Sequence, residues 1–322
     1  MRILVTGGAG FIGSHYVRTM LGGGYPGYED AEVTVVDKLT YAGNTENLPM
    51  GHPRLTFVRG DVCDQELLRR VLPGHDAVVH FAAESHVDRS VDGGVAFVHS
   101  NVLGTQSVLD ACLHTGVPTV VHVSTDEVYG SIETGSWTEE DPLLPNSPYS
   151  ASKAGSDLLA RAYHRTHGLD VRITRCPNNY GTHQHVEKLV PLFVTNLLRG
   201  LPVPLYGDGN NVREWLHVDD HCRAIQLVLT GGRSGETYNI GGATSLTNRQ
   251  MTQRLLDLCG ADWSMVRFVE DRKGHDYRYS VDDSKIRAEL GYAPRWTLDE
   301  GLKRVVDWYR DNPGWWKPLL DG

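Results

Sequence analysis

The stretch ILVTGGAGFIG, residues 3–13, decides the fold. Its first three residues form an apolar run that predicts a short buried strand, and a helical pattern follows the glycines. Gly7, Gly10 and Gly13 lie between this strand and this helix. Glycines at this spacing let backbone amides at the helix N-terminus approach a pyrophosphate closely. We therefore expect a dinucleotide-binding turn here.

A second apolar run, residues 33–36, ends at Asp37. A carboxylate at this point accepts hydrogen bonds from an adenosine ribose and repels a 2′-phosphate. NAD is therefore favoured over NADP, although Lys38 beside the carboxylate weakens that preference. Asp61 follows a third apolar run and is placed to contact the adenine end of the dinucleotide.

Strand and helix patterns alternate along the first half of the chain. Apolar runs at 55–58, 77–83 and 119–123 are separated by helical patterns at 64–72 and 95–115. Near-continuous apolar strands between helices are typical of a parallel sheet covered on both faces. We expect an α/β, Rossmann-like doubly wound parallel sheet followed by a smaller C-terminal substrate-binding domain.

Tyr149 and Lys153 are four residues apart and would lie on one face of a helix. For Tyr149 to work as a base near neutral pH, its pKa must fall by roughly 3 units. Lys153, a cationic nicotinamide ring and the helix N-terminus, with Ser147 as N-cap and Pro148 first in the helix, are expected to lower it. The spacing alone also fits a surface tyrosine and a solvated lysine. It indicates a catalytic pair only in combination with the glycine turn.

Two acids, Asp126 and Glu127, follow the strand at 119–123 and Thr125. Ligands of parallel sheets bind at the carboxyl ends of the strands, where residues 82–85 and 124–127 both fall. Neighbouring residues of a regular strand point to opposite faces. Both carboxyl groups therefore reach one ligand only if the strand has already ended; otherwise they are two solvated acids.

Composition excludes several classes of protein. The chain has 322 residues, 40% of them hydrophobic, with a net charge of −9, which argues against a nucleic-acid surface. Five scattered cysteines without a CxxC pair indicate reduced thiols. We find neither a signal peptide nor an apolar run of membrane-spanning length, and expect a cytoplasmic protein.

The apolar faces of the helices at 95–115 and from Tyr149 predict a homodimer built through a four-helix bundle.

Several motifs together carry a resemblance to a known family. They include TGGAGFIG, AAESHVDRS, VSTDEVYGS, PYSASKAGSD, DRKGHD and WYRDNPGWW, and matching segments span nearly the whole chain. The chain resembles the dTDP-glucose 4,6-dehydratases, which are extended short-chain dehydrogenases/reductases. The resemblance implies NAD as a recycled cofactor, dTDP-glucose as the substrate and a 4-keto-6-deoxy sugar as the product. It also implies that residues 1–176, with a later return at about 213–242, bind NAD, and that residues 177–322 mainly bind the nucleotide sugar.

The resemblance assigns a role to each catalytic residue. Tyr149 would take the proton of the sugar 4-hydroxyl, Thr125 would hydrogen-bond that oxygen, and Lys153 would hold Tyr149 and the nicotinamide ribose. Glu127 would remove the C5 proton, and Asp126 would protonate the C6 oxygen so that water can leave. Asp126 then needs a raised pKa, from an apolar site or from the charge of Glu127.

The resemblance also implies two sets of binding residues. The NAD set is Gly7, Gly10, Phe11, Ile12, Gly13, Asp37, Lys38, Thr40, Asp61, Val62, Phe81, Ala82, Ala83, Ser100, Tyr149, Lys153 and Asn179. The nucleotide-sugar set is Ser85, Thr125, Glu127, Asn178, Lys188, Leu189, Pro204, Tyr206, Arg213, Asn239, Arg272 and His275. Arg213 and Arg272 suit a diphosphate because a guanidinium group matches paired oxygens.

The sequence departs from the usual family pattern at Pro177 and at Thr182-His183. Because of these changes, the conformation of the segment around Asn178, and the role of Asn178 as a sugar ligand, are not decided by the resemblance. His183 and His185 with Glu187 have the composition of a metal cluster, but such pairs are more often without a metal, so we expect none.

Three alternatives stay open from sequence. A UDP-galactose 4-epimerase shares the cofactor apparatus but does not need the acid pair, and a GDP-mannose 4,6-dehydratase shares the elimination but binds a purine. A non-catalytic dinucleotide sensor would have no use for Tyr149, Lys153, Asp126 and Glu127 together.

Overall fold

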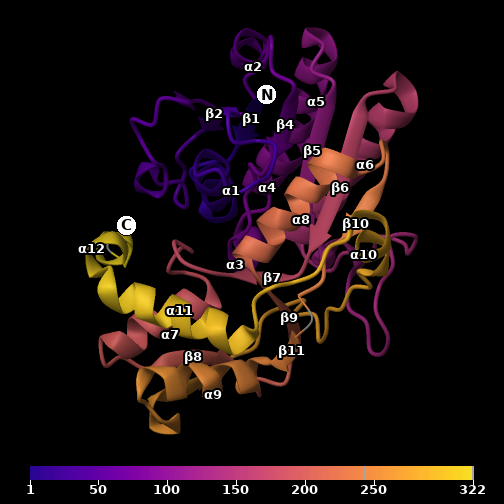
Figure 1. Cartoon of the computed structure of the whole chain (residues 1–322). Helices are drawn as coiled ribbons and strands as arrows, with labels where there is room; N and C mark the ends of the chain where they lie inside the picture. The colour runs from indigo at the N-terminus through magenta and orange to yellow at the C-terminus, as the bar shows by residue number, and fades with distance from the viewer. Residues whose placement is uncertain (243, 321–322) are drawn as a thin grey trace.

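The computed structural model describes residues 1–242 and 244–320 and confirms the α/β class (Figure 1). A seven-stranded parallel sheet has the order β10-β6-β5-β4-β1-β2-β3, the arrangement of a doubly wound dinucleotide-binding fold with one strand added. Its strands are β1 (Arg2–Thr6), β2 (Glu32–Asp37), β3 (Leu55–Arg59), β4 (Ala77–His80), β5 (Thr119–Thr125), β6 (Asp170–Cys176) and β10 (Thr237–Asn239).

Helices cover both faces of this sheet. One face carries α1 (Phe11–Leu21), α8 (Val218–Gly231) and α10 (Ser284–Leu290), and the other carries α2 (Gln65–Val71), α5 (Gly104–Thr115) and α6 (Pro148–His167). Each face has its own cluster of buried apolar side chains, as a sheet with apolar residues on both sides requires. The short helix α3 (Val87–Asp92) follows the loop after β4.

The single helix expected over 95–115 is wrong in detail. The structure has α4 (Val95–Phe97), a π-helical segment η2 (Val98–Leu103) and then α5. A π-turn adds one residue to a helical turn and shifts the side chains that follow, and such turns are frequent at functional sites. Here η2 carries Ser100 into the lining of the central cavity.

The smaller part is built from the later half of the chain. It contains the sheet β11-β9-β7 and the parallel pair β12-β8 around a core of their own. Its elements are β7 (Asn178–Tyr180), α7 (Leu189–Leu198), β8 (Val203–Tyr206), β9 (Val212–His217), β11 (Thr244–Thr247), α9 (Asn248–Cys259), β12 (Val266–Val269), α11 (Leu298–Asp311) and α12 (Pro313–Trp316). Short 3₁₀ turns lie at 263–265 and 317–320 in this part, and at 45–47 and 126–129 in the part built on the large sheet.

The chain crosses between the two parts more than once. After β7 to β9, helix α8 and strand β10 return to the large sheet, whereas β9 itself pairs with β7 and β11. In Figure 1 the yellow helices α11 and α12 lead from the smaller part back toward the indigo N-terminal elements. Among the helices of the described ranges, none combines the length and the apolar character that crossing a membrane needs.

Candidate active site

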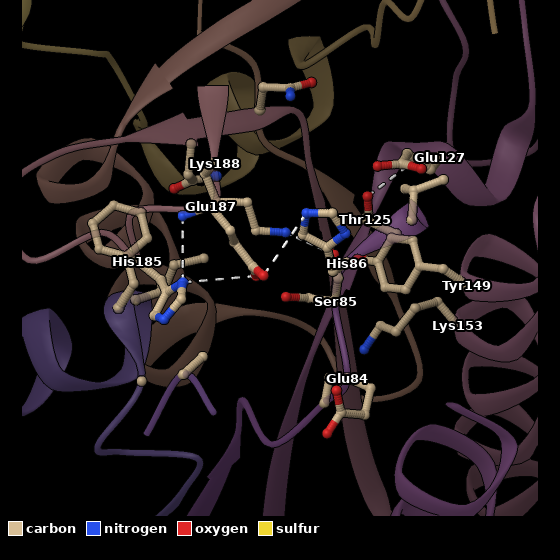
Figure 2. Close-up of a pocket in the computed structure, with 18 of the residues that line it drawn as sticks. Glu84, Ser85, His86, Thr125, Glu127, Tyr149, Lys153, His185, Glu187 and Lys188 are labelled. Atoms are coloured by element: carbon tan, nitrogen blue, oxygen red, sulfur yellow. Dashed lines mark hydrogen bonds and ion pairs between the residues drawn. The ribbon is translucent and has the colours of Figure 1, made fainter. Parts of the chain in front are cut away.

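A cavity of about 660 Å³ lies at the carboxyl ends of β1, β4 and β5 and is closed by the smaller part. Figure 2 shows Thr125, Glu127, Tyr149 and Lys153 on one side of it and His185, Glu187 and Lys188 opposite them. All five predicted catalytic residues line this cavity, as do all seventeen predicted NAD residues and every predicted sugar residue except Asn239.

The glycine turn is shaped by close contacts. Gly7 has a φ of 66°, and a Cβ there would lie 2.6 Å from the backbone nitrogen of Ala82. A Cβ on Gly13 would lie 2.4 Å from the carbonyl oxygen of Gly7. Only glycine fits both positions, and the bare backbone leaves a cradle at the N-terminus of α1 of the kind that binds a pyrophosphate. The turn therefore fits a dinucleotide.

The predicted ribose carboxylate is held at the end of β2. Asp37 Oδ2 accepts the Ala9 N–H at 2.9 Å, and Oδ1 accepts the Leu39 N–H at 2.8 Å. Burial raises the pKa of Asp37, although both hydrogen bonds lower it. Lys38, which weakened the preference for NAD in the sequence, lies 2.6 Å from Asp61 Oδ2. Because its charge is paired with Asp61, it is not free to attract a 2′-phosphate.

The acid pair lies just beyond β5. The strand ends at Thr125, and Asp126 and Glu127 begin the 3₁₀ turn η3 (Asp126–Tyr129), capped by the Thr125 hydroxyl, which accepts the Glu127 N–H. The alternation of a strand therefore does not apply, and both acids line the cavity. Asp126 is 2% exposed, and its Oδ2 has no hydrogen-bond partner among the described residues.

Both acids bind protons more tightly than usual. Burial, followed by the charge of Glu127, raises the pKa of Asp126 well above its ordinary value. Burial also raises the pKa of Glu127, while Arg213 and Lys188 oppose that rise. Asp126 is thus suited to hold a proton that it can donate, while at Glu127 two nearby cations oppose the rise of the pKa.

Helix α6 positions the phenol and the ammonium as predicted, with Ser147 as N-cap in a capping box and Pro148 at its start. The predicted lowering of the Tyr149 pKa by Lys153 and the helix N-terminus is wrong for the protein alone. Burial, followed by the charge of Glu127, raises the pKa of Tyr149 well above its ordinary value. Lys153 Nζ donates to the Val123 carbonyl at 2.8 Å, and burial lowers the pKa of Lys153 to about 8. The lowering of the Tyr149 pKa by a cationic nicotinamide ring stays a prediction.

A buried charge network lies under Lys153, one turn further along α6. Asp157 Oδ2 accepts Arg175 Nε at 2.9 Å, and Asp157 Oδ1 lies 3.3 Å from His122 Nε2. Burial raises the pKa of Asp157, but Arg175 and His122 outweigh it and lower the value to about 2. The ionised Asp157 in turn raises the pKa of Lys153 and helps to keep it charged. No local sequence pattern indicates this network, because its members come from β5, α6 and β6.

The opposite wall carries the predicted anion-binding cations. Lys188 Nζ donates to the Ser85 carbonyl at 2.9 Å. Arg213 lies over the Tyr279 ring with its guanidinium carbon 4.4 Å from the ring centroid, and Arg272 lies at the same distance over Tyr206. Both guanidinium groups also have partners within the protein: Arg213 donates to the Asp276 carbonyl at 2.8 Å, and Arg272 donates to Asp88 Oδ2 at 2.9 Å.

The prediction that Asn239 contacts the nucleotide sugar is wrong. It is fully buried in β10, where its Oδ1 accepts the Tyr129 hydroxyl at 2.8 Å and its Nδ2 donates to the Trp137 carbonyl at 3.0 Å. Asn248 lines the cavity instead, at the start of α9, and its buried Oδ1 has no partner among the described residues. Asn239 is the last residue of β10 and Asn248 directly follows β11, so both lie at strand ends, and only the tertiary arrangement shows which of them reaches the cavity.

The histidines near β7 are divided between two sites. His185 and His86 lie 4.0 and 3.8 Å from the oxygens of Glu187, on the cavity wall (Figure 2). Arg89 Nε pairs with the same carboxylate at 3.3 Å. His183 instead packs against Trp308, with ring centroids 4.3 Å apart. The three residues 183, 185 and 187 therefore do not converge. Glu84, His86 and Glu187 also line the cavity, although the site prediction did not include them.

The parallel sheet, the glycine turn and the Tyr149–Lys153 pair define an NAD-binding extended short-chain dehydrogenase/reductase. A family model described as GDP-mannose 4,6 dehydratase matches residues 4–305. The chain belongs to this family of nucleotide-sugar 4,6-dehydratases.

Individual relatives within this family are similar to the chain over almost its whole length. The chain is 60% identical to a dTDP-glucose 4,6-dehydratase of Streptomyces niveus over 321 residues, which cover 99% of this chain and 96% of that protein. It is 63% identical to the dTDP-glucose 4,6-dehydratase of Streptomyces antibioticus over 320 residues, 99% and 95% of the two chains. A solved structure is also similar: the crystal structure of a dTDP-glucose 4,6-dehydratase from Streptomyces venezuelae with NAD bound. Its sequence is 66% identical to this chain, its TM-score is 0.98, and the match covers 99% of this chain and 100% of that one.

Proposed function

We propose that this protein is a dTDP-glucose 4,6-dehydratase that converts dTDP-glucose to dTDP-4-keto-6-deoxyglucose and water. The observation that carries the proposal is the placement of Asp126 and Glu127, which leave β5 together and line the same cavity as Tyr149. An epimerase has no need for such a pair. The full-length similarity to enzymes of this name supports the nucleotide and the sugar.

NAD fits the glycine turn and Asp37, and when bound it accepts a hydride from C4 and returns it at C6. Tyr149 removes the proton of the 4-hydroxyl, and Thr125 hydrogen-bonds the same oxygen. The resulting C4 ketone acidifies the hydrogen on C5. Lys153, one turn further along α6, holds Tyr149 and the nicotinamide ribose.

The elimination then uses the two acids. Glu127 takes the C5 proton, and Asp126 gives its proton to the C6 oxygen, which leaves as water because hydroxide is a poor leaving group. Hydride addition at C6 and return of a proton to C5 complete the product. The raised pKa of the buried Asp126, and the cations Arg213 and Lys188 that act on Glu127, support these two tasks.

The two sets of binding residues belong to the same proposal. Arg213 and Arg272 hold the diphosphate on their aromatic supports, while Lys188 and Asn248 contact the sugar or the diphosphate. Pro204 and Tyr206 flank the base. The glycine turn, Asp37, Asp61 and Ser100 hold NAD.

The test is incubation of the purified protein with dTDP-glucose, followed by the absorbance that alkali induces in a 4-keto sugar. We expect this absorbance with dTDP-glucose and little with GDP-mannose. Formation of dTDP-galactose without a keto sugar would show an epimerase, and no turnover with NAD still bound would favour a sensor.

We also propose that the protein works in the cytoplasm as a homodimer whose interface is a four-helix bundle. Val95, Val98 and Leu103 along α4 and η2, and Leu158 on α6, expose 84%, 56%, 46% and 54% of their surface. These two helical segments pack side by side, so the exposed side chains form one apolar face that a second copy would cover.

A further inference from the structure

The C-terminal motif WYRDNPGWW, residues 308–316, has no part in the proposed chemistry, yet its aromatic rings lie in an ordered cluster. Trp308 and Trp315 have ring centroids 5.1 Å apart, and the ring of His183 lies 4.3 Å from the first and 5.4 Å from the second. His183 takes this place with a φ of 64°. The end of the chain is therefore fixed against the segment that follows β7.

One atom of this cluster reaches into the NAD-binding half. Trp315 Nε1 donates to Asn47 Oδ1 at 2.9 Å, across 268 residues of sequence. Asn47 is 2% exposed, and its Nδ2 donates to the carbonyl oxygen of Ala9 at 3.0 Å. Ala9 belongs to the glycine turn, and its own N–H is held by Asp37 at 2.9 Å. A continuous chain of hydrogen bonds thus links the C-terminal tryptophan to the turn that receives the pyrophosphate.

A second residue, Arg18, also holds Asn47 in place. Arg18 on α1 donates to the Asn47 carbonyl at 2.5 Å and lies 3.5 Å from His183 Nδ1. Burial, followed by the charge of Arg18, lowers the pKa of His183 to about 3, so the ring is neutral at neutral pH and its Nδ1 can accept. Arg18 and Trp315 therefore fix Asn47 from the two halves of the protein.

We propose that Asn47 and Trp315 are positioning residues for the cofactor, and that residues 308–316 act as a strap holding the glycine turn in its NAD-binding shape. Neither residue lines the central cavity, so both act through the backbone of Ala9. The inference rests on the proposed use of NAD. It predicts that damage to the strap weakens NAD binding and leaves the chemistry of the loaded enzyme unchanged.

The test compares Trp315→Phe with Trp263→Phe. Trp263 also donates its indole N–H to a side chain, Gln253 in the middle of α9, at 2.6 Å, and neither residue lines the central cavity. Loss of one buried hydrogen bond should raise the Kd for NAD about 3- to 10-fold in Trp315→Phe. The control should bind NAD like the wild type, and kcat at saturating NAD should stay within about twofold in both variants.

A double-mutant cycle distinguishes loss of the proposed hydrogen-bond chain from a general loss of stability. Asn47→Ala should weaken NAD binding at least as much as Trp315→Phe, and adding Trp315→Phe to it should cause little further loss, because both changes break one chain of hydrogen bonds. Unchanged NAD affinity in the single variants, or independent losses that multiply in the double variant, would overturn the proposal. If the wild type itself fails to bind NAD, the proposed function fails instead.

Discussion

Asp126 and Glu127 are neighbours in sequence, yet they carry opposite tasks because their surroundings differ. Asp126 Oδ2 is buried and has no hydrogen-bond partner in the described part of the chain, and the charge of Glu127 raises the pKa of Asp126, whereas both Arg213 and Lys188 act to lower the pKa of Glu127. Two adjacent carboxyl groups also interact, since the charge of Glu127 raises the pKa of Asp126. Ionisation of one therefore favours a proton on the other, which is the state that elimination requires.

Replacing Glu127 by Gln should stop the reaction after the first hydride transfer. Substrate should still reduce bound NAD, because Tyr149 and Thr125 are unchanged, but the C5 hydrogen should not exchange with solvent. Absorbance of NADH and deuterium incorporation would measure the two events. Normal turnover of this variant would contradict the role of Glu127 as the base.

Replacing Asp126 by Asn should abolish water loss and stabilise the fold at neutral pH. The folded protein holds the proton of Asp126 to a higher pH than the unfolded chain, so stability falls as pH rises from the ordinary pKa of 3.8 toward the raised folded value. Asn does not titrate. The gain in Tm, roughly 2 °C per kcal/mol relieved, should be larger at pH 7 than at pH 4. An equal gain at both pH values would argue against a raised pKa.

At the scale of elements, helix α6 supports both the catalytic pair and the charges beneath it. Asp157 lies one turn after Lys153 and pairs with Arg175 from β6. This arrangement fixes α6 against the sheet at the level of the active site. It also keeps a carboxylate near an ammonium whose own pKa has fallen to about 8.

Asp157→Asn should lower the free energy of unfolding by about 3–5 kcal/mol at pH 7, because it leaves the buried Arg175 without its anion. The folded pKa of Asp157 is about 2 against an ordinary 3.8, so its contribution is complete above 3.8 and is lost as pH falls toward 2. Urea unfolding measures the loss. Asp307→Asn, which breaks an exposed pair with Lys303, should change little, and an equal effect of both substitutions would contradict the prediction.

Elements whose signals are local could be predicted from sequence, and contacts between distant elements could not. The apolar runs and glycines of β1 and α1 are such local signals, as are the N-cap and proline of α6. The choice between Asn239 and Asn248 depends on which strand end faces the cavity, and periodicity does not contain that information. The π-turn of η2 and the burial that shifts the pKa values of Tyr149 and Lys153 likewise arise only when the elements pack.

For the whole molecule, the exposed apolar face of α4, η2 and α6 predicts the oligomeric state. Val95→Asp with Val98→Asp should convert the proposed dimer to a monomer, since two charges in an apolar interface have no partners there. Light scattering with size exclusion would measure the mass. Val269→Asp, on an exposed valine of β12, is the control, and a dimer that survives the double substitution would place the interface elsewhere.

The bond between Trp315 and Asn47 has a consequence for biosynthesis. The glycine turn leaves the ribosome well before Trp315, which lies 268 residues after Asn47. Chains that fold as they emerge complete their N-terminal elements early. If Trp315 supports the glycine turn as proposed, the nascent cofactor pocket lacks this support until residues 308–316 have emerged, and a chain terminated before Trp315 would carry the whole nucleotide-binding motif and still hold its coenzyme poorly.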